Sequence, residues 1–213
     1  KPIVRETVGR FLRSGLSPSK IYVVTPDVDA YSFESANQYS VIHESMIEKI
    51  GKADLVKRLG GRSSRAGWYY QQLLKYAIVE YFSSEIDILI CDADTVIIDD
   101  LSGLKNGFPE AREWNQSYFY GLKMLTGLSP VLQKSAIVNF MLFDARYMRS
   151  LLSEIEFRSG KSWTDAIIDL LAGNQQFDFS EYEVYANWEA SVPAPVFRLF
   201  KCSSDTKFCT SQL

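Results

Sequence analysis

The sequence predicts a single α/β domain over residues 1–213, with a mostly parallel central sheet flanked by helices. Segments with helical periodicity alternate along the chain with short apolar runs that are bounded by turn residues. The clearest helical segment leads directly into an apolar strand. With 213 residues, of which 46% are hydrophobic and 23% are charged, the chain is large enough to bury one sizeable core.

The first part of the chain is expected to form a helix, a strand and a second helix. Apolar side chains recur at helical spacing over residues 4–12, and the apolar residues 21–25 form a strand that ends before a proline. A second helical pattern covers residues 44–59, and the GGRSSR sequence at residues 60–65 is expected to be a loop. Because a helix precedes the first clear strand, we expect either a short strand at residues 2–4 or a strand that precedes this chain.

The strongest helical pattern is AGWYYQQLLKYAIVEYF, residues 66–82. Its apolar stripe is made of Tyr70, Leu73, Leu74, Ala77, Ile78 and Tyr81. The polar side chains Gln71, Gln72 and Lys75 lie off that stripe. This helix leads into the apolar strand at residues 88–91, so the two segments form one helix–strand unit.

The second part of the chain predicts a buried strand followed by three capped helices. The strand is SAIVNFMLFD, residues 135–144. The helices begin at side chains that accept backbone N–H groups, namely Asp144, Ser162 with Asp165, and Ser180 with Glu183. Glycines end the first two helices. The run VFRLFK, residues 196–201, is expected to be an edge strand.

Composition limits the partners and the location of the protein. The net charge is −3, the pI is about 5.3, and no Lys/Arg-rich run is present, so no nucleic-acid partner is expected. We expect no transmembrane segment, because no apolar run is long enough to span a bilayer. Cys202 and Cys209 could form a bridge, but the three cysteines, Cys91 included, do not resemble a disulfide scaffold. We therefore expect a buried thiol at Cys91 and a cytoplasmic location. The chain starts at Lys1 without a Met, and we expect a domain cut from a longer protein.

The most informative stretch is ILICDADTVIIDD, residues 88–100, in which an apolar strand ends in two aspartates one residue apart. Side chains at i and i+2 of a strand point to the same side, so Asp92 and Asp94 are expected to project together. Two such carboxylates repel each other unless a cation lies between them. Few, hard oxygen ligands suit Mg²⁺ or Mn²⁺ that also holds a diphosphate. The alternative is a pair of turn aspartates without a ligand.

One enzyme class with this pattern is the haloacid-dehalogenase-type phosphatases, whose strand-D-x-D-x-[TV] motif resembles ILICDADTV. There the first aspartate is the nucleophile and the second an acid/base. That class also needs a later acidic motif after a further strand. Asp99 and Asp100 come too soon, and Asp165 and Asp169 lie within a predicted helix. A magnesium-dependent phosphatase is therefore the alternative interpretation.

A wider resemblance is to the GT-A glycosyltransferases. The segments RAGWYYQQLLKYA, ILICDADTVIIDDL and SEYEVYANW follow an order that is similar to a GT-A-like family of bacteria and viruses, and to small glycosyltransferases that algal viruses encode for capsid glycans. The resemblance covers roughly residues 20–190. It implies a GT-A-like, Rossmann-related sheet, with a nucleotide-binding half at residues 1–100 and an acceptor-side half at residues 101–213.

The resemblance also implies a ligand set. It implies a nucleotide-sugar donor, most often a UDP-sugar, a glycan or glycoprotein acceptor, and Mn²⁺ or Mg²⁺ as the cofactor. Asp92 and Asp94 would be the metal-site pair, and the Ala93 backbone would face the ribose of the nucleotide. Thr25 and Asp27 of the VVTPD segment would be polar contacts in the base pocket.

The remaining candidate residues each have a second interpretation. Arg65 would reach the diphosphate, or is an ordinary surface arginine. Glu181 or Glu183 would be the base that deprotonates the acceptor hydroxyl, or SEYE is only a helix cap. Many GT-A enzymes add a C-terminal histidine to the metal, but His43 lies in the other half and is expected to be structural.

The function expected from the sequence is metal-dependent transfer of a sugar from a nucleotide-sugar donor to a hydroxyl acceptor in glycan synthesis. The alternatives are the phosphatase and a catalytically inactive sugar-binding module. Trp163 and Trp188 are candidates for stacking on an acceptor sugar, with core packing as the other interpretation.

Overall fold

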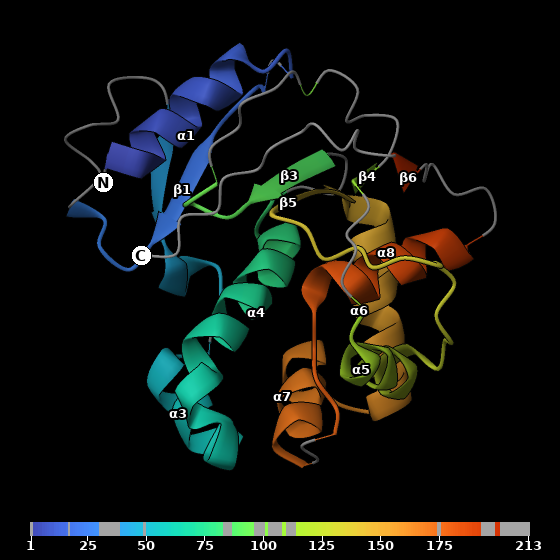
Figure 1. Ribbon diagram of the computed structural model, residues 1–213. Coiled ribbons are helices and arrows are strands. Elements are labelled where there is room, and N and C mark those ends of the chain that lie inside the picture. Colours follow the sequence, from blue (N-terminus) through green and yellow to red (C-terminus); the bar gives the residue numbers. More distant parts are fainter. Residues whose placement is uncertain are drawn as a thin grey trace.

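The computed structural model describes residues 2–16, 18–29, 39–48, 50–82, 87–95, 101, 108–109, 114–173, 176–192 and 199–200. Over these residues the chain is a mixed α/β structure, which confirms the predicted class (Figure 1). The elements in chain order are α1 (Pro2–Arg13), β1 (Tyr22–Thr25), β2 (Ser40–His43), the 3₁₀ helix η1 (Glu44–Met46), α3 (Lys52–Leu59), the 3₁₀ helix η2 (Gly60–Arg65), α4 (Ala66–Tyr81), β3 (Asp87–Cys91), β4 (Phe108–Pro109), α5 (Gln116–Thr126), β5 (Phe140–Asp144), α6 (Ala145–Ser159), α7 (Trp163–Gly173), α8 (Glu181–Ser191) and β6 (Leu199–Phe200).

In the parts of the chain that the structure describes, the strands pair two by two. Strands β1 and β2 run parallel, with Thr25 opposite His43. Strands β3 and β5 run antiparallel, with Cys91 opposite Phe140, and the short strands β4 and β6 run parallel. A continuous, mostly parallel central sheet is not shown, and the pair that contains the D-A-D strand is antiparallel.

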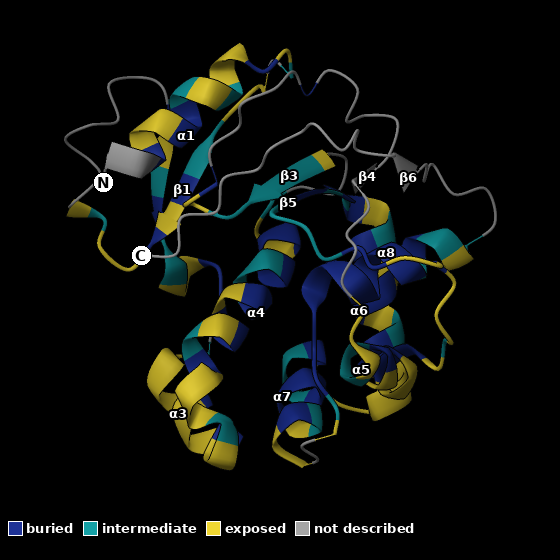
Figure 2. Ribbon diagram, viewed as in Figure 1, coloured by how far each residue is buried: buried dark blue, intermediate teal, exposed yellow. Residues whose placement is uncertain are grey.

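The main hydrophobic core surrounds α4 and draws on both sides of residue 100. It includes the fully buried Leu73 and Tyr76 of α4, Met141 of β5 and Ile167 of α7. Figure 1 shows α4 to α8 on one side of the strands and α1 on the other. Figure 2 shows that α8 is buried along most of its length, whereas much of α3 is exposed. The proposed division at residue 100 is therefore not a division of the core.

A smaller core joins α1 to the first strand pair. Val4 and Val8 of α1 pack with Val23 of β1 and with Tyr39. Residues 2–4, which were expected to form a strand or to follow one, belong to this helix. The main-chain N–H of Leu101 donates to the carbonyl of Ser14 at 2.8 Å, so the chain after the D-A-D segment returns to the end of α1.

The prediction of one continuous helix over residues 44–59 is wrong, because the helix is interrupted between residues 46 and 52. The structure has η1, a break, and then α3. In the break, the Glu48 side chain accepts a hydrogen bond from the Ile50 N–H at 3.1 Å, and the Gly51 carbonyl then accepts from the Asp54 and Leu55 N–H groups. A side chain that binds its own backbone competes with the helix in this way. The predicted GGRSSR loop is also wrong, because it forms η2.

Strand β2 and helix α5 are elements that the sequence interpretation missed. The signals for α5 were present, because Asn115 caps its start by accepting from the Ser117 N–H and Gly127 ends it with φ of 75°. The strand predicted from residue 135 begins only at Phe140. Cys202, Cys209, Asp99 and Asp100 lie outside the described residues, as does most of the predicted 196–201 strand.

Candidate functional site

The D-A-D segment forms a turn beyond the end of β3. The strand ends at Cys91, and the Thr95 N–H donates to the Asp92 carbonyl at 3.0 Å, which closes the turn. The expectation that strand alternation places Asp92 and Asp94 on one side is therefore wrong, because both residues follow the strand. Ala93 and Asp94 are exposed, and the Asp92 side chain is 35% exposed. Both carboxylates are thus accessible to a ligand from solvent.

Helix α1 contacts this turn through a buried hydrogen bond. The Thr7 hydroxyl donates to the Thr95 carbonyl at 2.9 Å, and both residues are buried. On the strand side, the Asp92 N–H donates to the Asn139 carbonyl at 3.0 Å. The neighbouring Cys91 is a free thiol whose Sγ lies 3.3 Å from the Asp92 carbonyl, and burial raises its pKa to about 12. The turn is therefore fixed by main-chain and buried hydrogen bonds, while Asp94 is exposed and Asp92 is partly exposed.

Lys75 of α4 lies between two carboxylates that the sequence interpretation assigned to different roles. Its Nζ is 2.7 Å from Asp92 Oδ1 and 2.6 Å from Glu181 Oε1, and it also lies 4.4 Å from the centre of the Tyr182 ring. Burial alone would lower the pKa of Lys75, but Glu181, Tyr182 and Asp92 raise it above its ordinary value. The lysine is therefore a cation, and it joins the predicted metal aspartate to the predicted base.

Three side chains of α4 fix the position of Glu181, the first residue of α8. The Glu181 N–H donates to Gln72 Oε1 at 3.1 Å, its carbonyl accepts from the Tyr76 hydroxyl at 2.8 Å, and its carboxylate binds Lys75. Burial raises the pKa of Glu181, and Lys75 opposes that rise. The residue is 5% exposed, so its carboxylate reaches solvent poorly in this structure.

Glu183 has a different environment from Glu181. It is fully buried, its Oε2 accepts from the Ser135 hydroxyl at 2.8 Å and the Ala136 N–H at 3.0 Å, and its Oε1 accepts from Asn187 Nδ2 at 3.1 Å. These contacts hold residues 135–136 against α8, which explains why β5 starts later than predicted. The Ser180 hydroxyl accepts from the Glu183 N–H, so the predicted cap is confirmed. This geometry favours a structural role for Glu183 over that of a base.

The predicted base-pocket residues lie at the end of β1. Thr25 is 8% exposed and its hydroxyl oxygen accepts from the Asp27 N–H at 3.1 Å, while Asp27 is exposed. Figure 1 shows that the arrows of β1 and β3 point to the same side of the molecule. The ends of these strands, with Thr25 and Asp27 on one and the D-A-D turn on the other, therefore lie on a common side.

Arg65 is not in contact with the D-A-D carboxylates. Its Nη1 donates to Asp178 Oδ2 at 2.7 Å, and its guanidinium lies over the Trp68 ring, with Cζ 4.2 Å from the ring centre. It precedes Lys75 by ten residues, or about 15 Å of helix. The Arg65 side chain is 44% exposed, but its ion-pair partner Asp178 is only 10% exposed. The predicted contact of Arg65 with a diphosphate stays a prediction.

The residues present fit a metal that arrives with a diphosphate better than a resident metal centre. Within the described ranges, no group of three or more His, Cys, Asp or Glu side chains converges as a metal site. Mg²⁺ is commonly held by one or two carboxylates together with substrate phosphates. Asp92 and Asp94 are the carboxylates that the sequence predicts for such a site. His43, at the end of β2, accepts from the Ser45 N–H at 3.2 Å, in agreement with a structural role.

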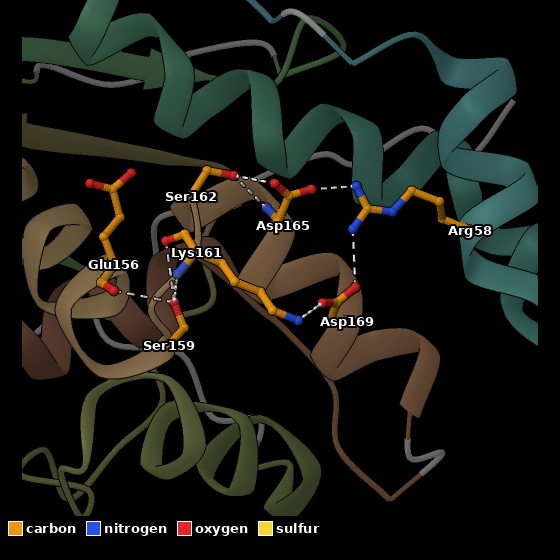
Figure 3. Close-up of polar contacts among 7 residues, drawn as sticks. All are labelled: Arg58, Glu156, Ser159, Lys161, Ser162, Asp165 and Asp169. Carbon is orange, nitrogen blue, oxygen red and sulfur yellow. Dashed lines mark hydrogen bonds and ion pairs between the residues drawn. The ribbon is translucent and has the colours of Figure 1, made fainter.

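The aspartates that a phosphatase would need as a later acidic motif are engaged elsewhere. Asp165 and Asp169 lie in α7, as predicted, and Figure 3 shows Arg58 reaching toward both of them. Arg58 Nη2 lies 3.0 Å from Asp169 Oδ1, and Lys161 Nζ lies 2.6 Å from Asp169 Oδ2. Cations thus neutralise this pair in a surface network. Its geometry does not support a metal site shared with Asp92.

Fold and site together define an α/β protein with a lysine–carboxylate cluster beside a surface D-A-D turn. The chain belongs to a family of unknown function (DUF6492), whose model matches residues 2–206. No curated protein and no solved structure matches the chain. Among the described helices, none is both long and apolar enough to cross a membrane.

Proposed function

We propose that this protein is a metal-dependent glycosyltransferase that moves a sugar from a nucleotide-sugar donor, a UDP-sugar, to a hydroxyl group of a glycan or glycoprotein. The observation that carries the proposal is the position of the Lys75 ammonium group between Asp92 and Glu181. This ammonium group contacts Asp92 of the exposed D-A-D turn at 2.7 Å and is held by the buried Glu181. A fixed cation thus contacts the first of the two carboxylates proposed to hold a divalent metal.

This combination suits the departure of a nucleoside diphosphate. Negative charge builds on the diphosphate as its bond to the sugar breaks, and preorganised positive charge beside it lowers the barrier. A Mn²⁺ or Mg²⁺ ion on Asp92 and Asp94 supplies that charge when it is bound. Lys75 supplies a second positive charge that needs no reorganisation, because Glu181 already fixes it.

We further propose that the two strand pairs belong to a GT-A-like arrangement. Helix α1 supports this by contacting both pairs, since Val8 packs with Val23 of β1 and the Thr7 hydroxyl binds the turn that follows β3. The carboxyl ends of β1 and β3 lie on a common side (Figure 1). Ligands of open α/β sheets bind beyond such ends, and Thr25 and Asp27 are therefore kept as the candidate base-pocket contacts, with the Ala93 backbone nearer the ribose.

The test is whether UDP raises the melting temperature only when Mn²⁺ or Mg²⁺ is present. We expect Asp94→Asn to abolish this shift, because an amide does not neutralise a divalent cation beside a diphosphate. Asp54→Asn, at an exposed aspartate of α3, is the matched control and keeps it. Equal shifts with and without metal, or a parental shift in Asp94→Asn, would refute the proposal.

Assays on the same purified protein distinguish a transferase from a phosphatase and from an inactive sugar-binding module. A transferase releases UDP slowly from a UDP-sugar in the presence of metal. A phosphatase instead cleaves simple phosphate esters and becomes phosphorylated on Asp92, and an inactive sugar-binding module does neither. A panel of UDP-sugars, with p-nitrophenyl phosphate as the phosphatase probe, therefore distinguishes the three.

A further inference from the structure

The N-terminal end of α4 carries an exposed aromatic surface around Arg65. Trp68 is 38% exposed, with the Arg65 guanidinium over its ring. The Tyr118 ring of α5 lies 6.5 Å from the Trp68 ring, centre to centre, at an interplanar angle of 33°. We call these three residues the Trp68 shelf. Two rings from different helices and one guanidinium thus meet at the surface.

The buried side chain of Asp178 holds Arg65 of this shelf in place. Its carboxylate accepts from the Tyr69 hydroxyl at 2.8 Å, from the Phe179 N–H at 2.9 Å and from Arg65 at 2.7 Å. Burial, with the carboxylate of Asp178, raises the pKa of Tyr69 to about 12, so the hydroxyl stays a donor. Arg65 is therefore held in place by a buried carboxylate and not by a chance surface contact.

Asp178 also locks α5, and with it Tyr118, against α4. The Asp178 N–H donates to the Ser117 carbonyl at 3.1 Å. At Gly121, one turn further along α5, a Cβ atom would lie 2.0 Å from the Asp178 carbonyl oxygen, so only glycine permits the approach. The backbone of α5 is thus fixed on both sides of Tyr118.

The shelf and the proposed active site lie along the same face of α4. Trp68, Gln72 and Lys75 are spaced i, i+4 and i+7, so they follow one face of α4 over about 10 Å. Asp178 below the shelf is three residues from Glu181 at the cluster. Gln72, between them, is 2% exposed, and its Nε2 has no hydrogen-bond partner among the described residues. The helix face therefore links the lysine cluster to the shelf through a buried donor that is still unpaired.

We propose that the Trp68 shelf binds a pyranose residue of the acceptor glycan, which rests on the proposed glycosyltransferase function. One face of a pyranose is made of C–H groups, which stack on the electron-rich face of an aromatic ring. Because the Arg65 guanidinium covers one face of the Trp68 ring, the sugar would use the other face. The N–H groups of Arg65 and the Tyr118 hydroxyl are donors for the sugar hydroxyls beside that face. Because Trp68 and Lys75 are separated by about 10 Å of helix, the acceptor would extend beyond the sugar that receives the transferred residue.

Trp68 is the aromatic residue that fits this role, in place of those the sequence suggested. Trp163 is 4% exposed and packs on Tyr76 in the core. Trp188 is partly buried, and its Nε1 donates to the Ser150 hydroxyl at 2.8 Å. Trp114 is 53% exposed, and its ring packs against Phe119, with the ring centres 4.1 Å apart, so it is not one of the three shelf residues. It supplies a matched control.

The test uses saturation-transfer NMR with methyl glycosides and reducing disaccharides of glucose, galactose, mannose and N-acetylglucosamine, without nucleotide or metal. We expect at least one of them to bind the parent protein, Trp68→Leu to weaken that binding at least tenfold, and Trp68→Phe to keep part of it. Trp114→Leu binds as the parent does. Circular dichroism and thermal melting confirm that each variant is folded.

Several outcomes would overturn the proposal that the Trp68 shelf binds a sugar. These are no binding by any sugar of the panel, equal binding by the parent and Trp68→Leu, or loss of the UDP–Mn²⁺ thermal shift in Trp68→Leu, which would place Trp68 in the donor site. Failure of the proposed function is a separate result. In that case the shelf binds sugar and needs Trp68, whereas UDP gives no metal-dependent shift in the parent protein.

Discussion

Lys75 and Glu181, 106 residues apart in the chain, meet at 2.6 Å in a largely buried ion pair. The pair fixes the start of α8 against α4 and leaves the ammonium group within 2.7 Å of Asp92. A buried ion pair is weak evidence for stability, because desolvation offsets much of the attraction. Stability alone therefore does not account for this pair, and the proposed function gives its positive charge a role beside the D-A-D turn.

The first prediction concerns Lys75→Met, which removes the cation and keeps much of the side-chain length. Glu181 is then left as a buried carboxylate without its ion-pair partner, a change that typically costs about 3–5 kcal/mol. We expect urea denaturation to show a loss of stability of that order, together with loss of the metal-dependent UDP shift.

The double variant Lys75→Met/Glu181→Gln separates the two effects. Because it removes the buried charge as well, we expect it to regain much of the stability but none of the UDP shift. If stability returned together with nucleotide binding, Lys75 would be a structural residue only.

The second prediction concerns Glu181→Gln, which keeps the shape of the side chain and its main-chain contacts to Gln72 and Tyr76. We expect metal-dependent UDP binding close to that of the parent and transfer slowed by about 10²–10⁴-fold, the usual contribution of a general base. The measurements are the UDP thermal shift and the rate of transfer from a UDP-sugar. Transfer at the parental rate would leave SEYE as a helix start without a catalytic role.

The third prediction concerns Glu183, which the structure places in a buried hydrogen-bond network with Ser135, Ala136 and Asn187. Glu183→Ala leaves the buried N–H and hydroxyl donors without their acceptor, at about 1–3 kcal/mol for each buried group left unpaired. We expect lower stability in urea with an unchanged metal-dependent UDP shift in the folded protein. A stable variant that has lost transfer would instead return Glu183 to the list of candidate bases.

Local patterns predicted the helices with strong caps and missed the contacts that assemble the site. Helix α6 begins at Asp144, which accepts from the Arg146 N–H, and ends at Gly160 with φ of 66°, and all of this is encoded within neighbouring residues. The break before α3 depends on one side chain, that of Glu48, turning back to the Ile50 N–H. Such a hydrogen bond between a side chain and the backbone cannot be predicted from the spacing of hydrophobic residues.

The contacts of the candidate site also could not be predicted from local sequence patterns. Asp92 and Glu181 were predicted from their motifs, but Lys75 appeared only as a polar residue off the apolar stripe of α4. Its importance depends on partners 17 and 106 residues away in the chain. The two interpretations of Glu183 could not be separated for a similar reason, because its carboxylate binds Ser135, 48 residues earlier.

The last prediction concerns Glu189 and pH. This residue of α8 is 3% exposed, and its Oε2 has no hydrogen-bond partner within the described part of the chain. Burial raises the pKa of Glu189 to about 7, Tyr185 opposes the rise, and Asp144 and Asp87 add to it. In the unfolded chain the carboxyl group titrates near 4.5. Between these values the folded protein binds more protons than the unfolded one, so stability falls as pH rises and levels off above about pH 7.

Glu189→Gln, a neutral mimic of the protonated acid, tests this direction because it removes the titrating group and keeps its shape. We expect the parent to lose about 2–3 kcal/mol of unfolding free energy from this group between pH 5 and pH 8. In urea denaturation at the two pH values, the variant therefore shows a smaller decline than the parent and is the more stable protein at pH 8. Glu181 and Glu183 keep their own raised pKa values in both proteins, so the comparison isolates Glu189. Identical pH dependence in the two proteins would mean that Glu189 is ionised in the fold at little cost, through contact with a cation or with water that relieves its burial.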